Sequence, residues 1–418
     1  MSIDKLLTDT SADLRNRIAK EPIPPPPRLE SPPVRQTRRR PSWFVGIVSF
    51  TVILGVGVIA LLLQAPNPPG PIQAPNPVPP TSASQTPDTS LEAISEPTLF
   101  DAGPLTGRDG HSVVWTGSEL IVWGGVSSDA TGAPVADGAA YDPSSNSWRM
   151  LAAAPIAPRQ GHQAAWTGEE MLVVGGLGHH DGAAYNPASD TWRLLPSTPV
   201  PTTSPAPIVT QYTSSVWDGR ELVMWNVPAD VVAAYSPATD SWRPLVSTNL
   251  EADAGVLRWN GAELYAFAIE AFDPRVSHLR AARFDSEQWG RLTDLEIPSP
   301  MPMLSAWTGE EFIAWNDTGE SFRYLEAEDA WVSSPAIPIS GCEGVGEPLE
   351  IERGVLVFNW CGVDAILDAE TGEWTTLRVP GLGRGSHAVW TGEEVLLWGD
   401  LYGNENDPSA ILAWRLSP

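Results

Sequence analysis

Residues 159–195 read RQGHQAAWTGEEMLVVGGLGHHDGAAYNPASDTWRLL, and residues 108–150 repeat the pattern as RDGHSVVWTGSELIVWGGVSSDATGAPVADGAAYDPSSNSWRM. Each stretch contains four short apolar segments, separated by glycine, proline and small polar residues that favour turns. The second segment, MLVV or LIVW, is apolar on both faces, as expected for a strand buried between two layers. Four strands in about 40 to 50 residues are typical of one β-propeller blade.

The turn sequence WTG-x-E and its variants mark further copies of this unit. Its glycine recurs at Gly117, Gly168, Gly219, Gly261, Gly309, Gly354 and Gly392. Successive glycines lie 38 to 51 residues apart, and an apolar segment follows each of them. The sequence therefore predicts an all-β, seven-bladed β-propeller over residues 95–418.

Three features of these repeats resemble the kelch repeat. They are a glycine pair after the second strand (Gly175 and Gly176), a tyrosine at the end of the third (Tyr185) and a tryptophan in the fourth (Trp192). The resemblance covers residues 95–418 and is complete in the first two repeats, whereas Asn226 takes the place of the pair in the third. Kelch repeats form β-propellers, so the resemblance implies the fold that the repeat count also predicts.

The last repeat ends at residue 418 without a fourth strand. Aligning His111 with His162 places residues 97–101 (PTLFD) in the fourth-strand position. We therefore expect this N-terminal segment to complete the last blade, which would close the ring and remove two exposed strand edges.

Charge is unevenly distributed along the 418-residue chain, which has 25 Lys and Arg against 51 Asp and Glu and a formal net charge of −26. Residues 1–42 hold nine basic and five acidic residues, whereas residues 64–418 hold 16 Arg, no Lys and 46 acidic residues. Because nucleic-acid affinity depends on Lys and Arg that neutralise phosphates, we expect no nucleic-acid partner. The 36 glycines and 42 prolines favour strands and turns over helices.

Residues 43–63 (WFVGIVSFTVILGVGVIALLL) carry no charge. A helix of this length spans about 30 Å, which is the thickness of the hydrocarbon core of a bilayer. A buried core helix would need a polar stripe, and a cleaved signal peptide would need a shorter apolar run with an Ala-x-Ala site. The sequence therefore predicts a single-pass signal anchor, a transmembrane helix that stays attached.

Four arginines precede this span, at Arg35, Arg38, Arg39 and Arg40. By the positive-inside rule they place the N-terminus in the cytoplasm and the propeller outside it. We expect the basic tail, residues 1–42, to be largely disordered, although apolar residues at helical spacing also allow a short helix that docks a partner. Residues 64–94, rich in Pro, Ser and Thr, are expected to form a stiff linker.

The two cysteines are Cys342 and Cys361. The kelch-like propellers include a copper oxidase whose site needs a cysteine crosslinked to a tyrosine, so the resemblance raises that alternative. Cys361 stands where the first glycine of the pair is expected, and Cys342 precedes the adjacent first strand. In an oxidising compartment we expect these two thiols to form a disulfide. We find no phosphate-binding loop, zinc-ligand spacing or G-x-S-x-G motif, and expect no cofactor.

The pattern R-x-x-H enters the first strand of three repeats that become neighbours when the ring closes. The residues are Arg108 with His111, Arg159 with His162, and Arg384 with His387. In the kelch family an arginine at this place lies on the ligand-binding face, so the resemblance implies a binding site. The planar donor fork of arginine suits a carboxylate, and we expect these arginines to anchor an anionic group.

The loop between the second and third strands of the second repeat adds His179, His180 and Asp181 to the same arc. These side chains are candidate metal ligands. The alternative for the repeated histidines is that each forms a hydrogen bond within its own blade.

These observations favour a membrane-anchored, extracytoplasmic propeller that binds a peptide, protein or glycan, because the motif search finds no assembled nucleophile and base. One alternative is an extracytoplasmic hydrolase or metal-dependent enzyme. Another is a transmembrane signalling regulator with a propeller as its sensor domain.

Overall fold

A computed structural model of the chain describes residues 98–129, 131–202, 213–252, 254–270, 277–297, 304–316, 318–338, 348–352, 354–358, 364–377, 386–400 and 411–416. All of these residues belong to the second of two compact units, Ser84–Pro418. Their regular structure consists of β-strands. No helix in these ranges is long and apolar enough to cross a bilayer. The expected transmembrane helix, the tail and the linker to residue 94 lie outside the described residues.

The described strands form seven antiparallel sheets of four or five strands and one two-stranded ribbon. Blade 1 contains β3 (Ser112–Trp115), β4 (Leu120–Trp123), β6 (Gly138–Asp142) and β7 (Ser147–Met150). Blade 2 contains β8 (Gln163–Trp166), β9 (Met171–Val174), β10 (Gly182–Asn186) and β11 (Thr191–Leu195). Blade 3 contains β12 (Thr213–Trp217), β13 (Leu222–Asn226), β14 (Val231–Ser236) and β15 (Ser241–Pro244).

Blade 4 contains β16 (Ala254–Trp259), β17 (Leu264–Glu270), β18 (Ser277–Phe284) and β19 (Trp289–Arg291), and β20 (Leu295–Ile297) also pairs with β18. Blade 5 contains β21 (Leu304–Trp307), β22 (Phe312–Trp315), β23 (Ser321–Leu325) and β24 (Ala330–Ser334). Blade 6 contains β25 (Leu349–Ile351), β26 (Gly354–Val357), β27 (Asp364–Asp368) and β28 (Trp374–Leu377). Blade 7 contains β29 (His387–Trp390), β30 (Val395–Asp400), β31 (Ile411–Leu416) and β1 (Thr98–Leu99).

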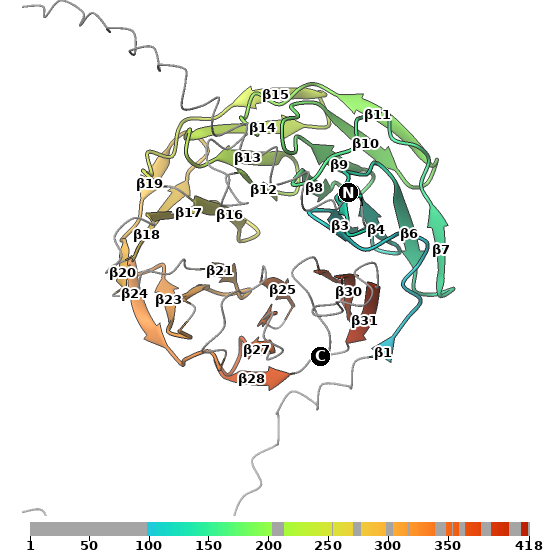
Figure 1. Cartoon of the computed structure of the whole chain (residues 1–418). Helices are drawn as coiled ribbons and strands as arrows, with labels where there is room; N and C mark the ends of the chain where they lie inside the picture. The colour runs from blue at the N-terminus through green and yellow to red at the C-terminus, as the bar shows by residue number, and fades with distance from the viewer. Residues whose placement is uncertain are drawn as a thin grey trace, which may run out of the picture. The chain divides into compact units, whose positions relative to one another are not determined.

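The sheets are arranged as a ring around a central axis, as in a β-propeller (Figure 1). The first strand of each blade contacts the first strand of the next, in the order β3, β8, β12, β16, β21, β25, β29 and back to β3. The ribbon of β2 (Arg108–Asp109) and β5 (Val126–Ser127) joins two loops of blade 1. The fold is therefore the all-β propeller that the repeats predicted.

The WTG-x-E motif forms the hairpin turn between the first and second strands. The Thr116 hydroxyl accepts a hydrogen bond from the backbone N–H of Glu119 at 2.8 Å, and Gly117 between them has a φ of 95°. In the WDG variant the Asp218 carboxylate accepts the equivalent bond from Glu221 at 2.6 Å. The motif recurs because each hairpin needs a side-chain acceptor followed by a residue that tolerates positive φ.

The hydrophobic core lies mainly between blades. Ile121 and Trp123 of blade 1 pack with Met171 of blade 2 in one cluster, and Leu396 of blade 7 packs with Leu120 of blade 1 in another. All five side chains are fully buried. Full burial of one such side chain contributes about 1.5–3 kcal/mol, so each boundary is held chiefly by these contacts.

A tryptophan in the fourth strand links each of several blades to the preceding blade. The indole N–H of Trp192 donates to the Ala152 carbonyl at 2.9 Å. Equivalent bonds of 2.7 to 3.0 Å join Trp148 to Asp101, Trp242 to Pro196, Trp289 to Val246 and Trp331 to Thr293. The repeated tryptophan is thus both a core side chain and a donor across the boundary.

Residues from the N-terminal side complete blade 7, as predicted. Thr98 and Leu99 pair with Arg415 and Trp414 on β31. The ring of Phe100 stacks on Tyr141 of blade 1 with 4.3 Å between centroids. Since the Asp101 carbonyl accepts from Trp148 as Ala152 accepts from Trp192, this segment occupies the fourth-strand position of the last blade.

Candidate functional site

Two loop units with the same construction lie side by side on blades 1 and 2. In the blade 2 unit, Arg159 Nε donates to the Ala157 carbonyl at 2.9 Å and Nη1 donates to the Gly175 carbonyl at 2.9 Å. Its Nη2 donates to Asp181 Oδ2 at 3.0 Å. The arginine therefore joins the loop before the first strand to the loop after the second.

The blade 1 unit uses Arg108 in the same way. Its Nε donates to the Thr106 carbonyl at 3.0 Å, and Nη1 donates to the Gly124 carbonyl at 3.1 Å and to Asp137 Oδ1 at 2.9 Å. The loops before the first strand and the loops after the second strand therefore open on the same face, as the sequence predicted.

The glycine pair allows this close approach of the two loops. Gly125 has a φ of 98°, and a Cβ added there would lie 2.8 Å from the Asp109 carbonyl oxygen. At Gly176, with a φ of 108°, an added Cβ would lie 3.0 Å from the Gln160 oxygen. Any larger residue would push the R-x-G-H segment away, so the glycine pair and the arginine form one structural unit.

The exposed part of each unit is a carboxylate. The side chains of Arg108 and Arg159 are 0% exposed, whereas those of Asp137 and Asp181 are 48% and 45% exposed. The hydrogen bond from Arg159 lowers the pKa of Asp181 below its usual value, so this group is ionised at neutral pH. The surface therefore presents acceptor oxygens held from beneath by buried guanidinium groups.

Two histidines of R-x-x-H, His111 and His162, are interior groups, whereas His387 is half-buried. His162 Nε2 lies 2.8 Å from the Ser112 hydroxyl, and His111 Nδ1 lies 3.1 Å from the Arg108 carbonyl oxygen. Each ring packs edge-on against a tryptophan of the preceding blade: His111 against Trp398 and His162 against Trp123. The bond from His162 crosses the blade boundary, so its hydrogen bonding is not confined to its own blade.

Burial keeps both histidines neutral. It lowers the pKa of His162 to about 3, with Arg159 as the next cause, and lowers the pKa of His111 well below 6.5. The ring of His387 lies 4.6 Å from that of His111, between centroids. The neutral rings of His111 and His162 therefore pack at the junction of blades 7, 1 and 2.

The structure gives no support to the metal interpretation of the blade 2 loop. His179 Nδ1 lies 3.8 Å from Asp181 Oδ1, and Asp181 is already bound to Arg159. Within the part of the chain that the structure describes, no group of three or more His, Cys, Asp or Glu side chains is placed to hold a metal ion. Arg384, Cys342 and Cys361 lie outside the described residues, so the third arginine and the disulfide stay predictions.

Asp137 was not among the residues singled out from the sequence. The available signal was the string DGAAY, which occurs in both repeats with Asp137 and Asp181 at its first position. A carboxylate repeated beside a repeated arginine indicates an ion pair, whereas the arginine alone suggested an exposed donor.

Comparisons with known proteins assign this chain to no family. No protein-family model matches the sequence, and no curated protein matches it. The chain is similar to a solved structure titled "Structure of YjhT", with 11% identity and a TM-score of 0.45 over 76% of this chain and 96% of that one. At this level of similarity the likeness carries no argument about function.

Proposed function

We propose that the protein is a seven-bladed, kelch-type propeller that acts as a binding module for a peptide, protein or glycan partner. The observation that carries this proposal is the repeated loop unit of blades 1 and 2. Each unit fixes one half-exposed carboxylate on a buried arginine, and side-chain order that exists before binding reduces the entropy lost on association. Two such groups on adjacent blades form a rigid pattern of acceptors.

The chemistry of the face favours a partner that donates hydrogen bonds. Asp137 and Asp181 offer carboxylate oxygens to amide, hydroxyl or ammonium groups. A strongly anionic partner would meet a domain whose sequence is itself acidic. A neutral or mixed-charge peptide or glycan fits best. Arg108 and Arg159 would meet an anion only after their aspartates moved, so that role stays a prediction.

We further propose that residues 43–63 anchor the chain in a membrane, with the propeller on the extracytoplasmic side. The uncharged span and the arginines before it support this arrangement. A protease added to intact cells or spheroplasts should then cut in the propeller or in residues 64–94. Digestion confined to residues 1–42 would contradict the orientation.

The binding proposal can be tested with the full-length chain on peptide and glycan arrays. The variant Asp137→Asn/Asp181→Asn keeps an acceptor oxygen for each arginine but removes both surface charges. We expect its capture of the selected partner to fall about fivefold or more. Glu169→Gln is the matched control, because Glu169 is an exposed acid in the hairpin turn at the opposite end of blade 2. Equal capture by the double variant and the control would contradict the assignment of this face.

A further inference from the structure

A pocket lies at the outer edge of the ring, where blades 5 and 6 meet, and other boundaries carry side chains that this one lacks. Between blades 2 and 3, Arg193 Nη2 binds Glu170 Oε2 of its own blade at 2.7 Å. Its Nη1 binds two groups of the next blade, Asp240 Oδ1 at 3.1 Å and the Tyr235 hydroxyl at 3.3 Å. We call this set of an arginine, its own glutamate and the acceptors of the next blade an inter-blade bridge.

The same bridge occurs at two more boundaries. Between blades 1 and 2, Arg149 binds Glu119 at 2.6 Å and the Tyr185 hydroxyl at 2.8 Å. Between blades 4 and 5 the arginine comes from the third strand instead of the fourth. There Arg283 Nη1 binds Glu326 of the next blade at 2.8 Å. The arginine can therefore stand on either strand, provided that the next blade supplies an acceptor.

Between blades 5 and 6 the arginine is present but its acceptors are missing. Arg323 occupies the third-strand position of Arg283, since each precedes the last aromatic residue of its strand. In blade 6, Leu367 pairs with Trp374 as Tyr235 pairs with Trp242, and Gly372 stands five residues later, where blade 3 has Asp240. The phenol and the carboxylate that serve Arg193 are thus replaced by an isobutyl group and a hydrogen. Glu326, which serves Arg283, stands two residues after Tyr324, and its counterpart two residues after Leu367 is Ala369.

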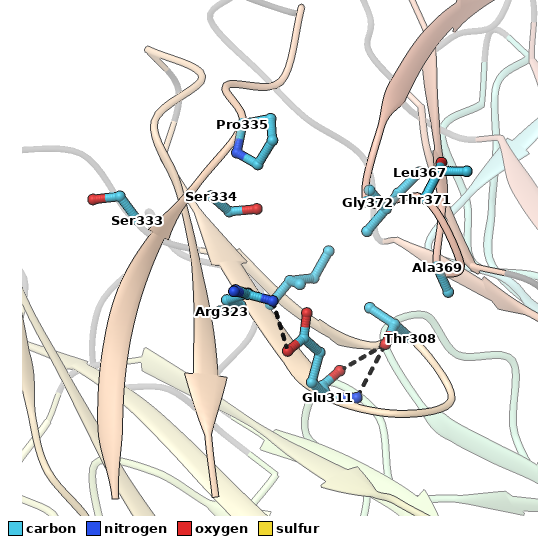
Figure 2. Close-up of a pocket in the computed structure, with 11 residues that line it drawn as sticks. Thr308, Glu311, Arg323, Ser333, Ser334, Pro335, Leu367, Ala369, Thr371 and Gly372 are labelled. Atoms are coloured by element: carbon cyan, nitrogen blue, oxygen red, sulfur yellow. Dashed lines mark hydrogen bonds and ion pairs between the residues drawn. The ribbon is translucent and has the colours of Figure 1, made fainter. Parts of the chain in front are cut away.

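The space of the missing groups is a pocket of about 200 Å³. Figure 2 shows Arg323 and Glu311 on blade 5, with Ser334 and Pro335 on one side and Leu367 and Gly372 of blade 6 across from them. Arg323 Nη1 and Glu311 Oε2 form an ion pair at 3.8 Å, a separation beyond hydrogen-bonding distance (Figure 2). No hydrogen bond from the Arg323 guanidinium group is found among the described residues. Its side chain is 48% exposed, so the donors are open to a ligand.

We propose that this pocket binds a small monocarboxylate, with its carboxylate on Arg323 and its apolar part against Leu367 and Ile313. The ligand would supply the two groups that blade 6 lacks, which are a carboxylate such as that of Asp240 in blade 3 and an aromatic ring such as that of Tyr235. A benzoate-like molecule has both groups. A guanidinium group can hold a carboxylate through two parallel hydrogen bonds. Ser334 supplies a further hydroxyl at the wall.

Glu311 allows the charge of the bound ligand to be tested. Its carboxylate lies beside Arg323 and repels an anionic ligand, and burial already raises its pKa. A carboxylate should therefore bind more tightly when Glu311 is made neutral. A cationic ligand, which would use Glu311 as its acceptor, should bind more weakly after the same change.

The experiment is a titration of the full-length chain with benzoate, benzyl alcohol and benzylammonium, followed by calorimetry and ligand-observed NMR. Of the three probes, we expect only benzoate to show saturable binding. Its affinity should fall about tenfold or more in Arg323→Gln and rise in Glu311→Gln. Benzylammonium binding that weakens in Glu311→Gln, or benzoate binding that is absent or unchanged in Arg323→Gln, would overturn the proposal.

A second pair of variants separates occupancy of the pocket from damage to the fold. Gly372 has a φ of 69°, close to the 46° of Asp240, and an added Cβ there meets nothing within 4 Å. Gly372→Asp should place an internal carboxylate at Arg323, abolish benzoate binding and raise the melting temperature. Gly372→Asn has the same size without the charge and should reduce benzoate binding less. If benzoate binds equally to both variants, Arg323 is not its anchor.

Discussion

The boundary between blades 2 and 3 and the boundary between blades 5 and 6 have similar cores and different outer edges. Leu222 and Met224 pack against blade 2, and Val355 and Val357 pack against blade 5, with all four side chains buried. At the rim, the first boundary has a complete inter-blade bridge and the second has a pocket. The comparison indicates that the apolar second strands hold the ring, and that a boundary can lack the bridge at its rim while it keeps this core.

The largest effect is expected where strand pairing itself is broken. A chain lacking residues 64–103 loses β1, the stacking of Phe100 on Tyr141 and the acceptor of Trp148. We expect its melting temperature to fall by about 10 °C or more, or the protein to aggregate, because blade 7 then has an open edge.

Deletion of residues 64–90 alone is the control, and it should leave the melting temperature nearly unchanged. Circular dichroism of the two shortened chains measures the difference. Equal stability would show that β1 does not close the ring.

The next effect concerns the loop units that support the candidate binding face. Arg159→Ala removes a fully buried side chain and leaves the carbonyls of Ala157 and Gly175 without their donor. We expect a loss of about 2–4 kcal/mol in the free energy of unfolding, measured by denaturant titration. Arg323→Ala, at the exposed edge of blade 5, should change it by less than about 1 kcal/mol. Similar losses in the two variants would remove the distinction between buried and rim arginines.

Acidification should weaken the junction of blades 1 and 2 through His162. Its pKa is about 3 in the folded chain and 6.5 in the unfolded chain, so the unfolded chain binds more protons between these values. The contribution of His162 to the free energy of unfolding is therefore fully present above pH 6.5. It decreases as the pH falls toward 3, by about 2 kcal/mol at pH 5. The charged or titratable groups that oppose protonation are Arg159 and His387, and Ser112 and Trp123 are the other neighbours.

His162→Gln should flatten this part of the stability profile, measured by thermal melts from pH 7 to 5. An unchanged slope would assign the acid sensitivity to other groups. Aspartates such as Asp181, whose pKa is lowered, contribute only below about pH 4.

The sequence predicted the elements whose chemistry is local. WTG-x-E marks a hairpin because Thr116 and Gly117 satisfy that turn by themselves, and MLVV marks a buried strand because no polar residue interrupts it. Ring closure was also predictable, because the missing fourth strand and residues 97–101 match in register.

The sequence did not reveal which side chains are exposed. The burial of Arg159 depends on the carbonyls of Gly175 and Asp181, which reach it only through the path of two loops. The pocket was equally hidden, because it arises from what Leu367 and Gly372 lack relative to their counterparts. A motif is recognised by residues that are present, whereas this pocket depends on side chains that blade 6 lacks.

The smallest effects should come from single groups of the bridge. Tyr235→Phe removes a hydroxyl that donates to Asp240 at 2.6 Å and accepts from Arg193 at 3.3 Å, and its ring remains buried. We expect a loss of about 1 kcal/mol in unfolding free energy, the usual net contribution of such hydrogen bonds.

Leu367→Tyr makes the reverse change at the incomplete boundary and places a phenol near Arg323. It should stabilise the chain by less than Tyr235→Phe destabilises it, because no carboxylate stands at Gly372 to accept from the new hydroxyl. The double variant Leu367→Tyr/Gly372→Asp should exceed the sum of its single variants, since tyrosine and aspartate act together in the complete bridge. Strict additivity would mean that the groups of the bridge act independently.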